Sequence, residues 1–302
     1  MLLLLTTFTA LAGVVETARG PVDVTITGEG PAVLVFHGAP GGSDQGELLA
    51  PLAEAGFQVL ALSRPGYLDT PLSSGATYAA QGDLAAALLD ALGLDQAAAV
   101  GLSAGGPAAL AFAARHPDRS WALVLEAAVV DAYVPPDQAE NELLGRLILS
   151  PLVAGPTFRM LRRNMLRHPE RAAARLLALE STLDAPAREA CAAQLGQDPV
   201  PWAALADSFV PYRHRRAGLR NDLTQLAGVD AADWSGLSAP TLLQYSPSDA
   251  DVPVRHAQAL LDQGVDATLV LHPSACGHFL WLGPSSEAVA AERLAFLSAH
   301  SP

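Results

Sequence analysis

Short apolar runs alternate with helical stretches through the first part of the chain, and this alternation constrains the fold more than any other feature. The runs occupy residues 32–36, 58–62, 97–102 and 121–125. Strands that are buried on both faces of a parallel sheet have this nearly continuous apolar pattern. Alanine- and leucine-rich helical stretches separate them, at residues 45–55, 78–92 and 104–115. The order predicts an α/β fold with a mostly parallel central sheet flanked by helices.

The alternation stops after Val130 and returns late in the chain. Residues 131–238 contain no convincing strand, and prolines interrupt their helical patterns. Later strands and helices are expected at residues 241–245, 253–261, 267–271 and 286–299. We therefore predict one core, made of residues 1–130 and 239–302, that is split by a helical insertion at residues 131–238.

The N-terminal segment, residues 1–12, is apolar, but it has no positively charged residue and is too short to span a bilayer. Its small-residue sequence Ala10-Leu11-Ala12 resembles the cleavage site of a leader peptide. The competing interpretation is an N-terminal strand or helix of a cytoplasmic protein, since residues 22–27 alternate like a half-buried strand. We favour a cytoplasmic protein and keep an exported or membrane-anchored one as the alternative.

All 18 basic residues are arginines, because the chain contains no lysine. Mechanisms that need a lysine Schiff base, a phosphate-loop lysine or a Ser-Lys pair are therefore excluded. The net charge of −13 repels phosphate backbones and anionic lipids, so no nucleic-acid partner is expected, and no membrane partner unless residues 1–12 are an anchor. Cys191 and Cys276 lie far apart in no metal-ligand spacing, which predicts neither a disulfide scaffold nor a zinc site and fits a reducing compartment.

The third apolar run leads directly into Gly101-Leu102-Ser103-Ala104-Gly105-Gly106, which precedes a helix. This pattern is typical of a nucleophile elbow, in which a serine lies on a strained turn between a strand and a helix. Side chains two positions before and after the serine would collide, so Gly101 and Gly105 make room for the turn. The helix N-terminus behind Ser103 offers partial positive charge to a developing oxyanion.

A nucleophilic serine needs a base and an orienting acid, and in this architecture they follow it in the order acid, then histidine. Asp249 comes after the strand expected at residues 241–245, and His278 comes after the one at 267–271. The competitors for these roles are Asp251, Glu126 at the end of the fourth apolar run, and His272 at a strand end. Position favours His278, which lies on the loop after its strand, but leaves the choice between Asp249 and Asp251 open. We interpret Glu126 as a structural carboxylate and expect most other histidines at the surface.

Several segments in chain order match one known pattern: His37-Gly38-Ala39-Pro40-Gly41, Arg64-Pro65-Gly66-Tyr67, the serine turn, the run from Asp249 to Pro253, and Gly277-His278-Phe279. Through them the chain resembles the α/β-hydrolase family over nearly its whole length apart from the insertion. The resemblance implies that Ser103 is the nucleophile, His278 the general base and then acid, and Asp249 the residue that orients the imidazole. It also implies an oxyanion hole made by the backbone N–H groups of Ala39 and Ala104. His37 is expected to organise the loop beside that hole, and residues 131–238 to form a cap domain.

Ser103 argues against the haloalkane dehalogenases and epoxide hydrolases of this fold, which use a carboxylate nucleophile, and leaves acyl transfer to water. The predicted reaction is hydrolysis of small or medium, partly apolar carboxylic esters through an acyl-enzyme, without metal or organic cofactor. The first alternative is an aminopeptidase similar to proline iminopeptidases, although Ala104 and the lack of identifiable cap carboxylates count against it. A carbon-carbon bond hydrolase, disfavoured by Leu102 where those enzymes have asparagine, and a binding protein of the same fold remain as further alternatives.

The arginines concentrate in the predicted insertion, which holds 12 of the 18. They form two clusters: Arg159, Arg162, Arg163 and Arg167, then Arg213, Arg215, Arg216 and Arg220. One interpretation is a solvated helix face. The other is an arginine at the mouth of the pocket that selects carboxylate-bearing esters. Five aromatic residues are expected either to line that pocket or to pack between helices: Trp202, Phe209, Tyr212, Trp234 and Trp281.

Overall fold

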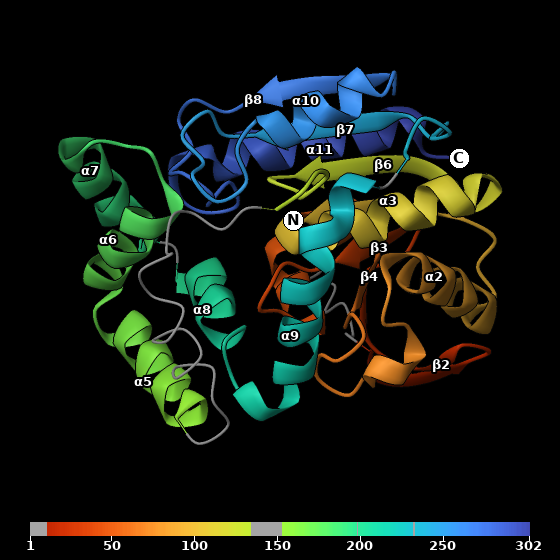
Figure 1. Ribbon diagram of the computed structural model, residues 1–302, viewed down its shortest axis with the longest axis horizontal. Helices are drawn as coiled ribbons and strands as arrows, with labels where there is room; N and C mark the ends of the chain where they lie inside the picture. Colours follow the sequence, from red (N-terminus) through yellow and green to blue (C-terminus); the bar gives the residue numbers. More distant parts are fainter. Residues whose placement is uncertain (1–10, 134–152, 198, 232) are drawn as a thin grey trace, which may run out of the picture.

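One sheet of eight strands organises the residues that the computed structural model describes, namely 11–133, 153–197, 199–231 and 233–302 (Figure 1). The strands lie in the order β1-β2-β4-β3-β5-β6-β7-β8, and every pairing from β4 to β8 is parallel. The β1-β2 and β2-β4 pairings are antiparallel. The strand bounds are β1 Leu11–Thr17, β2 Gly20–Thr27, β3 Ala32–Phe36, β4 Gln58–Leu62, β5 Ala97–Leu102, β6 Ser120–Glu126, β7 Thr241–Tyr245 and β8 Ala267–Leu271. The predicted mostly parallel α/β sheet is confirmed.

The inner strands β3, β5 and β7 are buried along their whole length, which explains why their sequences do not alternate. The edge strand β8 is partly exposed, and Leu271 leaves 44% of its surface open. At the opposite edge, Leu11 and Ala12 belong to β1, while residues 1–10, on which the leader and anchor interpretations depend, lie outside the described residues. Within the described residues, no helix is long and apolar enough to cross a membrane.

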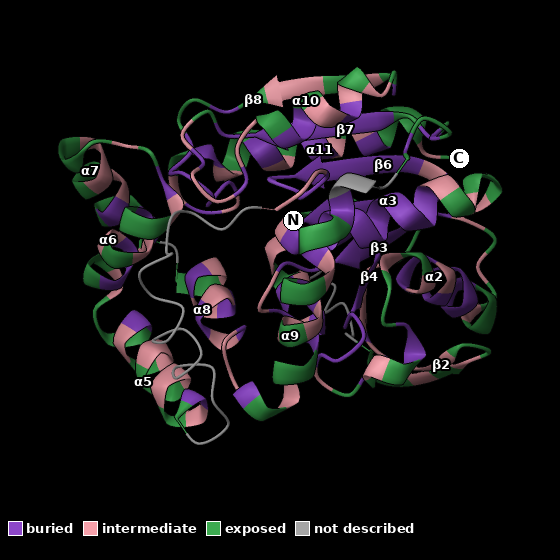
Figure 2. Ribbon diagram, viewed as in Figure 1, coloured by how far each residue is buried: buried purple, intermediate pink, exposed green. Residues whose placement is uncertain are grey.

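Helices cover both faces of the sheet and create a three-layer arrangement, with buried residues concentrated in the sheet and α3 (Figure 2). Along β3, Leu34 and Phe36 belong to the core shared with α2, α3 and α10, whereas Val33 and Val35 face the core shared with α1 and α11. These helices are α1 Ala50–Glu54, α2 Tyr78–Leu92, α3 Gly106–Arg115, α10 Arg255–Asp262 and α11 Ser286–His300. The layers hold the carboxyl ends of the strands at one edge of the core.

The helix predicted at residues 45–55 is divided into two parts. A 3-10 helix spans Ser43–Leu49, and α1 begins at Ala50. Pro51 lies in the first turn of α1, where its missing N–H is tolerated but would interrupt a continuous helix. The loop after β3 therefore turns tightly before it reaches the helix.

Residues 131–238, here called the helical segment, interrupt the core between β6 and β7. Their described part forms helices and contributes no strand to the sheet: α5 Ala154–Arg167, α6 Pro169–Glu180, α7 Ala185–Leu195, α8 Pro199–Asp207 and α9 Arg216–Gln225. In Figure 1, α5 to α8 lie beyond the end of the sheet toward which β6 and β8 point. Ligands of open α/β sheets bind at this carboxyl edge.

A disulfide joins Cys191 of α7 to Cys276, which corrects the expectation that these cysteines stay unpaired. The two residues are 85 positions apart, and only the packing of α7 against the loop after β8 brings them together. Spacing along the chain does not encode that contact. Because disulfides are typical of oxidising compartments, the expectation of a reducing compartment loses its support.

Candidate active site

The serine turn lies where β5 meets the helical turn before α3. Ser103 has a φ of +49°, in the left-handed region that side-chain-bearing residues rarely adopt. A Cβ at Gly105 would lie 2.1 Å from the carbonyl oxygen of Phe36, and one at Gly101 would lie 2.9 Å from the Cβ of Ala109. Both glycines therefore have the steric role that the sequence predicted.

Ser103, His278 and Asp249 form one hydrogen-bonded relay. Oγ of Ser103 lies 3.0 Å from Nε2 of His278, and Nδ1 of the same ring lies 2.8 Å from Oδ2 of Asp249. The other carboxylate oxygen, Oδ1, accepts the backbone N–H groups of Asp251 and Val252 at 2.9 Å each, so the carboxylate is held in one orientation. The geometry suits proton transfer from Ser103 to Nε2 and stabilisation of the resulting imidazolium by Asp249.

The C-terminal end of α6 fixes the two loops that carry the acid and the base. The carbonyl oxygen of Glu180 accepts the N–H of His278 at 3.0 Å and the N–H of Ala250 at 3.3 Å. The next residue, Ser181, forms an antiparallel bridge with Asp249. The helical segment is therefore part of the frame that positions the relay.

The competing acid and base have other partners. Glu126 accepts hydrogen bonds from Arg293 at 2.6 Å and from Gln244 at 3.0 Å, inside the core, so it is a structural carboxylate as predicted. His272 contacts the oxygen of the same Gln244 at 2.8 Å. Oδ2 of Asp251 lies 3.8 Å from Nε2 of His278, on the nucleophile side of the ring, where it does not orient Nδ1.

Two further histidines are buried. Nδ1 of His37 donates to the carbonyl of Gly38 at 2.6 Å, and Nε2 accepts the N–H of Arg64 at 2.9 Å, which is the predicted loop-organising role. Burial and the Arg64 charge lower the pKa of His37 well below its ordinary value, so this ring stays neutral. His256, expected at the surface, is buried, and Nδ1 accepts the N–H of Asp131 at 3.2 Å. It lies on the face of α10 that packs on the sheet, so that expectation was wrong.

The loop after β3 carries Ala39 past the serine. A Cβ at Gly38 would lie 3.3 Å from Cβ of Ser103, so the loop and the serine are in close contact. Gln45 braces the loop, because its Oε1 accepts the N–H of Gly38 at 3.0 Å. Ala104 lies in the helical turn that begins at Ser103, where the first backbone N–H groups lack helical partners and the helix dipole favours an anion. Ala39 lines the same cavity as Ser103, and Ala104 follows Ser103 in the chain, so their N–H groups are the candidate oxyanion donors.

A cavity of about 190 Å³ opens on Ser103 and His278. It is smaller than most sites for drug-sized molecules, which measure roughly 300–1,000 Å³. The apolar side chains among its described lining residues include Leu48, Leu102, Leu176, Leu205, Phe209 and Trp281. Of the five candidate aromatic residues, only Phe209 and Trp281 belong to that described lining, and the other three are buried in packing elsewhere.

The sequence pattern of the alpha/beta hydrolase fold matches residues 31–283, which is most of the chain. The chain belongs to the α/β-hydrolase fold family. It is similar to the uncharacterized hydrolase YcgS of Bacillus subtilis, with 27% identity over 279 residues that cover 92% of this chain and 95% of that protein. A solved structure of an alpha/beta hydrolase fold protein from Nakamurella multipartita matches with a TM-score of 0.82 at 36% identity, covering 96% of this chain and 99% of that one.

A shorter similarity connects this α/β-hydrolase to the 2-hydroxy-6-oxononadienedioate/2-hydroxy-6-oxononatrienedioate hydrolase of Comamonas testosteroni. The two are 32% identical over 110 residues, which cover 34% of this chain and 38% of that protein. The family and its hydrolase relatives identify the chain as an enzyme of the hydrolase class.

The cavity of this α/β-hydrolase is acidic, which overturns the hypothesis of an arginine at its mouth. Among the described residues that line it there is no arginine, whereas Glu180 and Asp251 both contribute. The described arginines Arg159, Arg213 and Arg216 instead surround a separate hollow near Tyr212. Sequence reasoning missed Glu180, because no motif marks the last residue of an insertion helix as a neighbour of Ser103.

The carboxylates control the charge of the site. Oε2 of Glu180 is buried and has no hydrogen-bond partner among the residues that the structure describes. Burial together with Asp251 raises the pKa of Glu180 to about 7. Burial alone would lower the pKa of His278, but Asp249, assisted by Asp251 and Glu180, outweighs it and raises that pKa above its ordinary value. The surroundings therefore favour the imidazolium form of His278.

The raised pKa of His278 predicts an alkaline pH profile. Because only the neutral ring accepts a proton from Ser103, kcat/KM for a neutral ester should rise with pH and reach half its maximum above the ordinary histidine value of about 6.5. Asp251→Asn removes a negative charge near Nε2 and should move this midpoint down by about one pH unit. Asp266→Asn, an exposed change before β8, is the matched control and should leave the midpoint in place. A midpoint that Asp251→Asn leaves unchanged would rule out this electrostatic coupling.

Proposed function

We propose that this α/β-hydrolase cleaves carboxylic esters through an acyl-enzyme, with Ser103 as nucleophile, His278 as general base and acid, and Asp249 as the orienting acid. The observation that carries the proposal is the continuous relay from Oγ of Ser103 through His278 to Asp249, which opens on a small cavity. This chemistry needs no metal and no organic cofactor.

In the proposed reaction, Oγ of Ser103 attacks the ester carbonyl carbon while its proton passes to Nε2 of His278. The carbonyl oxygen becomes an oxyanion, which the N–H groups of Ala39 and Ala104 stabilise. Collapse of this intermediate breaks the bond to the alkoxy oxygen, and His278 returns the proton to the leaving alcohol. Water, deprotonated by His278, then attacks the acyl-enzyme and releases the carboxylic acid and the free serine.

The proposed substrate is a neutral ester with a short acyl group. The cavity of about 190 Å³ favours small acyl chains, and its leucine, phenylalanine and tryptophan walls favour apolar ones. The carboxylates of Glu180 and Asp251 oppose a negatively charged acyl group in the same space. A small-molecule ester is thus the proposed partner, in place of the carboxylate-bearing ester that the arginine clusters suggested.

A matched pair of esters tests this charge preference. At pH 8, where Glu180 is mostly ionised, kcat/KM for p-nitrophenyl butyrate should exceed that for the similar but anionic p-nitrophenyl hemisuccinate by about tenfold, equivalent to about 1.4 kcal/mol. Glu180→Gln should narrow the ratio to less than about threefold, whereas the exposed Glu189→Gln of α7 should leave it unchanged. An equal preference of the wild type for both esters would contradict the acidic-cavity argument.

An aminopeptidase similar to proline iminopeptidases is the second candidate, and Glu180 is the observation that favours it. Oε2 of Glu180, which has no partner within the described part of the chain, lines the cavity together with Asp251 and would accept a substrate ammonium group. A panel of alanine and proline arylamides separates the two candidates. If Glu180→Gln raises KM for the arylamides and not for butyrate esters, the second candidate replaces the first.

The remaining alternatives have less support. A dioate substrate, such as the name of the Comamonas testosteroni relative denotes, carries two carboxylates that an acidic cavity would repel. Leu102 also stands where carbon-carbon bond hydrolases have asparagine. A non-catalytic binding protein does not require a hydrogen-bonded serine, histidine and aspartate, so the relay counts against that alternative.

The compartment of the protein is a separate proposal. The sequence favoured the cytoplasm, but the bond between Cys191 and Cys276 supports the exported alternative, because cytosolic proteins seldom keep structural disulfides.

A further inference from the structure

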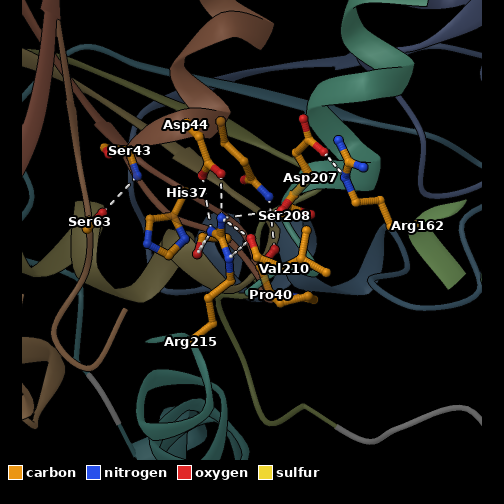
Figure 3. A network of polar contacts seen from close by, with 12 residues as sticks. His37, Pro40, Ser43, Asp44, Ser63, Arg162, Asp207, Ser208, Val210 and Arg215 are labelled. Atoms are coloured by element: carbon orange, nitrogen blue, oxygen red, sulfur yellow. Dashed lines mark hydrogen bonds and ion pairs between the residues drawn. The ribbon is translucent and has the colours of Figure 1, made fainter. Parts of the chain in front are cut away.

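The side chain of Arg215 leaves the helical segment and enters the core beside the active-site loop (Figure 3). Arg215 precedes α9 and is only 2% exposed. A buried guanidinium is stable only when its N–H groups find acceptors. The acceptors of Arg215 come from two loops, one in the core and one in the helical segment.

The core loop is the one that carries Ala39. Nη1 of Arg215 donates to the carbonyl oxygen of Gly41 at 2.6 Å and to Oδ1 of Asp44 at 3.1 Å, while Nη2 donates to Oδ2 of Asp44. A Cβ at Gly42 would lie 2.7 Å from Nη1, so the guanidinium packs directly on the loop backbone. The contact with Gly41 is two residues from the N–H of Ala39 that the oxyanion needs.

In the helical segment, Arg215 binds the loop at residues 207–210, which forms part of the cavity wall. Nε and Nη2 of Arg215 donate to the carbonyl oxygen of Val210 at 3.0 and 2.8 Å, and Nη2 also donates to that of Asp207 at 3.3 Å. Between these acceptors lie Ser208 and Phe209, which line the cavity with Ser103. One guanidinium therefore holds the oxyanion loop and the cavity wall in a fixed relation.

We propose that Arg215 is a positioning residue that sets the N–H of Ala39 for the transition state by linking the oxyanion loop to the helical segment. The inference rests on the proposed ester hydrolysis and adds a residue to it. Arginine suits the task because its planar fork of five donors, spread over three nitrogens, reaches acceptors in both loops, whereas an ammonium group has only three donors on one nitrogen. A displacement of about 1 Å at a reacting group lowers rates by up to about a hundredfold.

The test compares kcat with KM in four variants. Arg215→Gln and Arg215→Lys should lower kcat for p-nitrophenyl butyrate by about ten- to a hundredfold while KM changes less than about threefold. Asp44→Asn, a change of similar volume at a partly exposed carboxylate, should lower kcat in the same direction by about fivefold. The fourth variant, Arg213→Gln, removes an exposed arginine of the same cluster and should retain wild-type kcat and KM.

A transition-state mimic separates positioning from general loss of structure. A trifluoromethyl ketone forms a tetrahedral adduct with the serine, so its inhibition constant should weaken in Arg215→Gln in proportion to the fall in kcat/KM. The active fraction of each variant is counted by titration with a serine-reactive phosphonate, and kcat is expressed per labelled site. If Arg215→Gln does not fold, Asp44→Asn provides the same comparison.

The outcomes are distinguishable. Unchanged kcat per labelled site in both Arg215→Gln and Asp44→Asn, or a rise in KM alone, would overturn the positioning role while leaving ester hydrolysis intact. If the wild type hydrolyses no ester and takes no phosphonate label, the proposed function fails, and the positioning role fails with it. A parallel loss of kcat and ketone affinity in Arg215→Gln, with a loss of the same kind but smaller size in Arg215→Lys, supports the proposal.

Discussion

Replacement of Ser103 by alanine is expected to lower kcat/KM for p-nitrophenyl butyrate by about a thousandfold or more. The variant keeps the loop of Ala39 and the cavity but lacks the oxygen that attacks the carbonyl, so only the weak catalysis of the remaining site persists. Initial rates corrected for spontaneous hydrolysis measure the effect. Thermal unfolding should show an intact fold, because a small side chain replaces a small one.

Two controls support this prediction. Ser120→Ala removes a buried hydroxyl at the start of β6, the end of that strand opposite the catalytic edge, and should leave kcat/KM within about twofold of wild type. A phosphonate probe should add its mass to the wild type and to Ser120→Ala but not to Ser103→Ala. Turnover by Ser103→Ala above a tenth of the wild-type value would mean that another group is the nucleophile.

Replacement of Asp222 by asparagine is expected to lower the free energy of unfolding by about 3–5 kcal/mol. Asp222 of α9 accepts both terminal N–H groups of Arg64 at 2.7 Å and the hydroxyl of Tyr67 at 2.5 Å, and Arg64 and Asp222 are almost completely buried. Without the carboxylate, the Arg64 charge stays buried and uncompensated. Urea unfolding, followed by circular dichroism, measures the change.

A second variant distinguishes the loss of the charge pair from the loss of shape. The double variant Arg64→Met, Asp222→Leu replaces both charges by apolar groups and should be more stable than Asp222→Asn, because no charge remains buried. Asp118→Asn, on the exposed turn before β6, should change stability by less than about 0.5 kcal/mol. A loss below about 1 kcal/mol in Asp222→Asn would show that this ion pair contributes little to stability.

Local patterns predicted the sheet and the relay. Burial on both faces imposes continuous apolar sequences on β3 and β5. The serine turn requires small residues at Gly101 and Gly105. Both features depend on residues that are close in the sequence, so local patterns predict them. The order of the later strands placed Asp249 and His278 beside Ser103 through the parallel arrangement of the sheet.

The features that sequence analysis missed depend on contacts between distant segments. Glu180 reaches the cavity only because the end of α6 bridges to the loop of Asp249. Arg215, interpreted as one member of a solvated or substrate-selecting cluster, is buried against Asp44. The packing of helices in an insertion follows from side-chain shape over many residues, and composition or spacing does not encode it.

The bond between Cys191 and Cys276 closes a covalent ring that contains Asp249, whereas Ser103 and His278 lie outside it. A single cut in the backbone between these cysteines therefore opens the ring without dividing the protein into two molecules. A cut between α7 and α8, for instance, leaves Asp249 and His278 on the C-terminal fragment. The disulfide then joins that fragment to the N-terminal one, which carries Ser103. The helical segment is thus tied to the core by a covalent bond in addition to the backbone.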